Sequence, residues 1–88
     1  MKWEEVRSQF PETWVLVEAL QAESYQNKRV IYDMAVISDY KNSAEVWKGY
    51  KELHLQNRTR ELYIFHTRNK EIEVSEQNFA GIRSRQSQ

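Results

Sequence analysis

Four segments with the pattern of β-strands limit the folds open to this chain more than any other feature of its sequence. The last segment alternates apolar and polar residues with a period of two, and the other three are rich in apolar, aromatic and β-branched residues on both strand faces. The segments cover residues 13–25, 29–40, 60–67 and 71–75. The polar turns at residues 26–28 and 68–70 each contain an asparagine, which tolerates the left-handed backbone of tight hairpins. The sequence therefore predicts two β-hairpins.

A helix between the two predicted hairpins is the clearest single element. Asn42 can cap its first turn, and Glu45 can reach back from the third helical position. Apolar and aromatic residues then recur at helical spacing: Val46, Trp47, Tyr50, Leu53 and His54. We expect this helix to end near Asn57. A shorter helix is predicted over residues 3–10, before Pro11.

These elements predict an α+β fold in two layers, with the order α-β-β-α-β-β. We expect a mainly antiparallel four-stranded sheet with both helices packed on one face. Because 88 residues are too few for two separate cores, residues 1–76 are predicted to form a single α+β domain. Residues 77–88 are rich in Gln, Ser and Arg and are predicted to be a flexible C-terminal tail.

Charge and composition narrow the range of partners. Thirteen basic and 13 acidic residues give a net charge of +0, so the chain lacks the basic excess typical of nucleic-acid or membrane binding. Cysteine is absent, which removes disulfides and thiolate chemistry. No apolar run approaches the roughly 20 residues needed to span a bilayer. We therefore expect a cytoplasmic protein with no membrane partner.

The sequence shows no recognised catalytic or metal-binding motif. His54 and His66 are its only histidines, they lie on different predicted elements, and no HExxH pattern or cysteine pair accompanies them. The two glycines, Gly49 and Gly81, cannot form a glycine-rich phosphate loop. We expect a non-enzymatic protein without cofactor or metal, and a histidine-dependent enzyme is kept as an alternative.

One segment matches a pattern seen in proteins that bind single-stranded nucleic acid. Tyr63 and Phe65 lie on one face of a predicted strand, and Arg58, Arg60 and Arg68 lie near its ends. Strand-borne aromatic rings can stack on unpaired bases while arginines contact phosphates. Binding of single-stranded RNA or DNA is therefore the alternative function, against which the neutral charge balance counts.

The leading functional hypothesis follows from the amount of apolar surface on the predicted sheet. Apolar residues occupy both faces of the predicted strands, and helices on one face would leave the other uncovered. Trp14, Tyr32 and Tyr63 are candidates for this uncovered surface. We therefore expect an interaction module that binds a partner protein or itself, most simply as a symmetric homodimer.

Four segments together resemble a family of small uncharacterised bacterial proteins. They are residues 3–6, 14–19, 47–54 and 60–67, with sequences WEEV, WVLVEA, WKGYKELH and RELYIFHT. The similarity extends over most of the chain. It implies a stand-alone bacterial cytoplasmic protein and carries over no functional residue, because no activity is assigned to that family.

Overall fold

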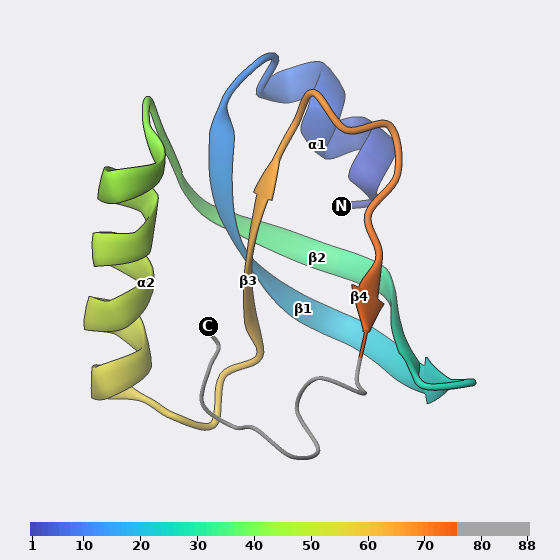
Figure 1. The fold of residues 1–88 in the computed structure, drawn as a ribbon. Coiled ribbons are helices and arrows are strands. Elements are labelled where there is room, and N and C mark those ends of the chain that lie inside the picture. The colour runs from blue at the N-terminus through green and yellow to red at the C-terminus, as the bar shows by residue number, and fades with distance from the viewer. Residues whose placement is uncertain (76–88) are drawn as a thin grey trace.

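The computed structural model describes residues 1–75 of the chain (Figure 1). The sheet has the strand order β3-β1-β2-β4, and every neighbouring pair is antiparallel. The elements are α1 (Trp3–Gln9), β1 (Trp14–Tyr25), β2 (Lys28–Tyr40), α2 (Ser43–Gln56), β3 (Leu62–His66) and β4 (Val74–Ser75). The predicted α+β class, the element order and the antiparallel four-stranded sheet are confirmed. The predicted tail, residues 77–88, lies outside the described residues.

The first predicted hairpin is the long β1–β2 pair at the centre of the sheet. Gln26 and Asn27 form its two-residue turn, with φ angles of 51° and 65°. Both angles are in the left-handed region, which matches the right-handed twist of the flanking strands. Three register shifts interrupt the pairing of the two strands, and such irregularities increase the local twist.

The second predicted hairpin does not form. β3 pairs with β1, whereas β4 pairs with β2 through Lys28 and Arg29, so the two strands lie on opposite edges of the sheet. The chain between them crosses the sheet, and Ile72 packs against the cluster formed by Val6, Val15 and their neighbours. Burial of Ile72 therefore takes the place of the hairpin that the polar residues 68–70 suggested.

Two apolar clusters lie on opposite faces of the sheet. Val15 and Val17 of β1 pack with Val6 of α1. Leu16, between them in the sequence, packs with Val46 of α2. Successive side chains of a strand point to opposite faces, so the helices lie on different sides of the sheet, as Figure 1 also shows. The expected placement of both helices on one face is corrected in this respect.

Helix α1 covers the sheet face that the sequence analysis left open. The Arg7 Nε donates to the Thr67 carbonyl oxygen at 2.8 Å, and the Trp3 indole N–H donates to the Asn69 carbonyl oxygen at 3.0 Å. The rings of Trp3 and Phe65 also meet edge to face, with centroids 5.4 Å apart. The apolar strand residues that point away from α2, such as Val15 and Val17, thus belong to a second small core under α1.

Helix α2 begins and packs much as its sequence indicates. The Asn42 side-chain oxygen accepts a hydrogen bond from the Glu45 amide at 2.9 Å, which caps the first turn. Near its middle, Gly49 lies directly on the ring of Tyr40, where a Cβ would be 2.3 Å from the phenol oxygen. Glycine therefore allows the close approach of α2 to the end of β2.

Candidate interaction surface at the β3 edge

β3 is an edge strand in the described part of the chain, and its hydrogen-bond pattern can be fixed from its two ends. The Ala19 amide donates to the Glu61 carbonyl oxygen at 2.9 Å. At the other end, the Thr67 amide donates to the Thr13 carbonyl oxygen, also at 2.9 Å. Both contacts continue the β1–β3 register, so Glu61 and Thr67 direct their backbone groups toward β1.

Alternation along β3 then assigns the direction of every residue between these ends. Tyr63 and Phe65 direct their N–H and C=O groups toward β1, as Glu61 and Thr67 do. Leu62, Ile64 and His66 direct theirs away from the sheet. The outer edge of β3 therefore presents backbone donors and acceptors that pair with no other strand of residues 1–75.

The far end of this edge is partly closed by the turn that follows it. The His66 carbonyl oxygen accepts a hydrogen bond from the Asn69 amide at 3.2 Å. The His66 Nδ1 accepts from the Arg68 amide at 3.1 Å. The open backbone groups are thus concentrated at Leu62, Ile64 and the His66 N–H.

A row of aromatic rings on α2 runs along one flank of the helix. Trp47 meets Tyr50 edge to face with centroids 5.6 Å apart, and Tyr50 stacks on His54 at the same centroid distance. The Trp47 side chain is 48% exposed although it is large and apolar. We call Trp47, Tyr50 and His54 the aromatic shelf.

The aromatic shelf lies on the side of α2 that faces away from β2. At 3.6 residues per turn, Trp47 is rotated by about 200° from Gly49, which contacts Tyr40 of β2. The buried face of α2 lies over Leu16 of β1 and Leu62 of β3. The shelf therefore faces the outer side of the sheet, beside the open edge of β3.

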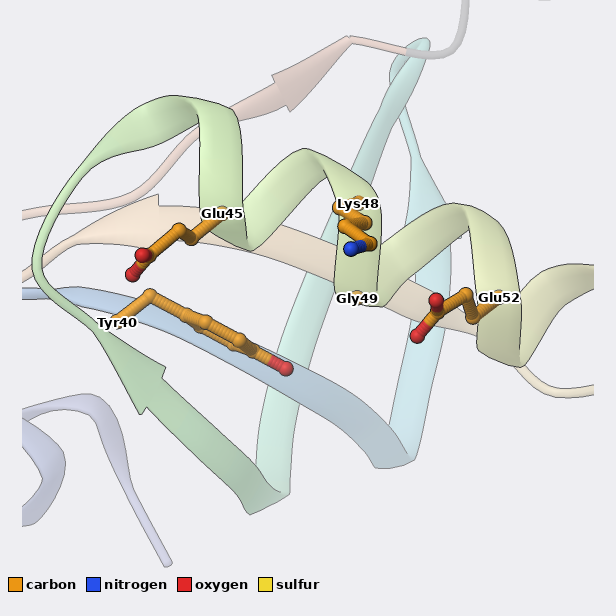
Figure 2. Close-up of a pocket in the computed structure, with 5 residues that line it drawn as sticks. All are labelled: Tyr40, Glu45, Lys48, Gly49 and Glu52. Carbon is orange, nitrogen blue, oxygen red and sulfur yellow. The ribbon is translucent and has the colours of Figure 1, made fainter.

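The opposite flank of α2 forms a shallow groove of about 280 Å³ (Figure 2). Tyr40 and Gly49 form its floor, and the charged residues along it are Glu45, Lys48 and Glu52. Figure 2 shows the Tyr40 ring lying along the helix, with Glu45 and Glu52 toward its two ends. Charges of both signs line this groove, and the geometry favours no particular ligand.

A third exposed region is the outer half of the β1–β2 hairpin. Leu20, Tyr25 and Tyr32 are its large exposed apolar residues, and Tyr25 at the turn is 64% exposed. The Tyr32 hydroxyl donates to the Glu23 carboxylate at 3.3 Å. Tyr32, one of the predicted surface residues, is therefore exposed as expected but lies away from the β3 edge.

The structure separates the other predicted aromatic residues onto two faces. Trp14 lies in the cluster beneath α2 and meets the His66 ring edge to face, with centroids 5.0 Å apart. Tyr63 and Phe65 lie on the α1 face, where their rings stack at 5.9 Å. These three residues are partly buried and do not form one continuous aromatic surface.

The arginines named with them are also not brought together around an aromatic platform. The Arg60 Nη2 pairs with the Glu18 carboxylate at 2.7 Å, and this hydrogen bond lowers the pKa of Glu18. Arg58 is exposed in the loop before β3. Binding of single-stranded nucleic acid stays a prediction, to which the packing of Tyr63 and Phe65 adds no support.

A partly buried charge cluster lies on the α1 side of β3. The Glu61 carboxylate accepts hydrogen bonds from Arg29 at 2.7 and 3.0 Å and from the Tyr63 hydroxyl at 2.6 Å. The hydrogen bond from Arg29 is the main cause of a lowered pKa of Glu61. Burial, followed by the nearby carboxylate, raises the pKa of Tyr63. This cluster ties β2 to β3 across β1.

The two histidines lie in different surroundings. His54 belongs to the aromatic shelf, whereas His66 packs on Trp14. Within residues 1–75, no group of three or more His, Asp or Glu side chains is arranged to hold a metal ion. Neither histidine has a carboxylate partner in the described contacts that would suggest an acid–base pair.

Comparison with known proteins gives no relative for this chain. No family model, curated protein or solved structure matches it significantly. In residues 1–75 there is also no helix with the length and apolar character required to cross a membrane. The predicted bacterial origin and cytoplasmic location stay predictions.

Proposed function

We propose that this protein is a non-enzymatic interaction module that binds another polypeptide chain at the outer edge of β3. The observation that carries the proposal is the alternation of backbone groups along this strand, which leaves Leu62, Ile64 and the His66 N–H directed outward. An extended segment can add to such an edge and satisfy these groups, which is a common mode of peptide recognition.

The aromatic shelf supplies a side-chain surface next to the backbone groups. A strand added beside β3 would point alternate side chains toward the α2 layer, where Trp47 is half exposed. Aromatic and apolar side chains on the added strand would contact the shelf and contribute most of the affinity. β3 is only five residues long, so a partner that used this edge alone would bind transiently.

Site-specific photo-crosslinking in the native cell tests the proposal. We expect the full chain carrying Trp47→p-benzoylphenylalanine to form a covalent adduct with another polypeptide on illumination. The same probe at Tyr25, on the exposed hairpin turn, should yield little or no adduct.

A matched pair of substitutions at Ile64 shows whether an adduct depends on the β3 edge. Ile64→Pro removes an outward N–H without removing a hydrogen bond to β1, and proline is tolerated at such edge positions. Ile64→Ala removes a similar amount of side chain and keeps the N–H. The proposal predicts that only Ile64→Pro abolishes the adduct. An absent adduct in the parent chain, or equal yields in both variants, would contradict it.

A further inference from the structure

We infer that the chain bound at the β3 edge is a second copy of this protein, paired antiparallel about a two-fold axis at Ile64. This inference rests on the proposed function and adds the identity of the partner. A symmetric dimer requires a surface that is complementary to itself, and the sequence of β3 meets this requirement.

The hydrogen-bond alternation and the length of β3 together select the register. In an antiparallel pair of identical strands, the two-fold axis passes midway between the two directly opposite copies of one residue. Ile64 is the central outward-facing residue of Leu62–His66. A two-fold axis at Ile64 lets its two copies exchange N–H···O=C bonds, and it places Leu62 opposite His66 of the partner.

A two-fold axis at any other residue would pair fewer residues of β3 with residues of the second β3. An axis at Leu62 would place Arg60 opposite Ile64, and an axis at His66 would place Arg68 opposite Ile64. Only the axis at Ile64 pairs all five residues of β3 with residues of the second β3. This register is therefore the one in which apolar and aromatic side chains face one another along the full strand.

The charges of the two copies are compatible with this arrangement. β3 contains no acidic, lysine or arginine side chain, and the net charge of the chain is +0. Beyond the strand ends, Arg60 of one copy lies opposite Arg68 of the other. Glu18 pairs with Arg60 at 2.7 Å and reduces this repulsion.

The helices also fit side by side. Strands in a sheet are about 4.8 Å apart, and α2 contacts β3, β1 and β2, so a helix centred over β1 lies about 7 Å from the proposed two-fold axis. The two copies of α2 would then be about 14 Å apart, which leaves space between them for the large aromatic side chains. The aromatic shelf of each copy would face that of the other and cover Trp47.

Sedimentation velocity across the micromolar to millimolar range tests the dimer. The full chain is expected to approach twice its 10.7 kDa mass as concentration rises. Ile64→Pro removes two N–H donors from the symmetric interface and should raise the dissociation constant at least about tenfold. Ile64→Ala keeps both donors and should retain measurable association.

A disulfide measurement tests the register and does not require the proline variant to fold. The chain contains no cysteine, so Ile64→Cys introduces a single thiol that faces its own copy. Mild oxidation should give a covalent dimer, because directly opposite strand residues lie within disulfide range. Leu55→Cys is the control, since Leu55 is 68% exposed on the helix surface opposite the buried face.

Three results would overturn the inference. The chain could remain monomeric at every concentration, Leu55→Cys could crosslink as readily as Ile64→Cys, or Ile64→Pro could associate as tightly as Ile64→Ala. If the photo-crosslinked adduct contained a different protein and no second copy, the proposed function would stand and the inferred partner would be wrong. If no adduct formed, both would fail.

Discussion

Glu61 connects three strands through its carboxylate and its backbone oxygen. Its carboxylate accepts hydrogen bonds from Arg29 of β2 and from the hydroxyl of Tyr63 of β3, while its backbone oxygen accepts from Ala19 of β1. The Glu61 and Arg29 side chains are 32% and 26% exposed. A charge-assisted pair in such a partly buried setting contributes more than a pair fully open to solvent.

Replacing Glu61 should change both stability and its pH dependence. The pKa of Glu61 is lowered in the folded state, mainly by Arg29, from an ordinary value of about 4.5. Its stabilising contribution is thus present above about pH 4.5 and is lost as pH falls through the lowered pKa. Denaturation should show that Glu61→Gln lowers the free energy of unfolding at pH 7 by about 1 to 2 kcal/mol and flattens its decrease in acid.

Glu73→Gln is the matched control for this measurement. Glu73 pairs with Lys28 at 2.7 Å, but their side chains are 70% and 55% exposed. Exposed ion pairs are screened by water and contribute little. Equal losses of stability in the two variants would contradict the role assigned to Glu61.

Among the elements, α1 is short but covers the apolar cluster around Val15 and Val17 on one face of the sheet. Its seven residues bury Val6 completely and place Trp3 against Phe65. The chain between β3 and β4 lies beside it, held by the Trp3 indole N–H. The cover of this face therefore depends on packing more than on the intrinsic stability of a two-turn helix.

Two substitutions at Trp3 separate packing from hydrogen bonding. Trp3→Phe keeps an aromatic ring against Phe65 and loses the bond to the Asn69 carbonyl oxygen, which should cost about 1 kcal/mol. Trp3→Ala loses the ring as well and should cost about 3 kcal/mol. Chemical denaturation monitored by circular dichroism measures both. Equal effects would show that the ring contact stabilises little.

Local sequence patterns predicted the elements well but not their arrangement. The cap at Asn42 and the turn at Asn27 act through neighbouring residues, so spacing alone was sufficient to find them. The positions of β3 and β4 depend on long-range packing of Ile72, which no local pattern encodes. The same limit applies to the candidate site, because only the strand order makes β3 an edge strand.

The alternation of apolar side chains between the two strand faces predicts part of the core arrangement but not which helix covers each face. Apolar residues occupy both parities of residues 14–19, and the sequence analysis expects one of the two sheet faces to be uncovered. The structure uses Val15 and Val17 for the α1 core and Leu16 for the α2 core. Trp47 and His54 lie at one edge of the apolar stripe predicted for this helix. Side chains at such an edge are expected to be half exposed, as Trp47 is.

At the scale of the whole described fold, residues 1–75, a helix covers an apolar cluster on each face of the sheet and the outer edge of β3 is open. Self-association is therefore expected at a strand edge and not on an apolar sheet face. Two copies joined at this edge would form one continuous sheet of eight strands, with the α2 helices side by side on one face. Such a dimer would bury the aromatic shelf and pair the outward backbone groups at one interface.

Amide hydrogen exchange followed residue by residue tests the β3 edge most directly. In dilute full-length protein, the amides of Tyr63 and Phe65 should be protected and those of Leu62 and Ile64 should exchange rapidly. At high concentration, Leu62 and Ile64 should become protected as well. Amides of Leu62 and Ile64 that stay unprotected at every concentration, or that are already protected in the monomer, would contradict an edge open to a second copy.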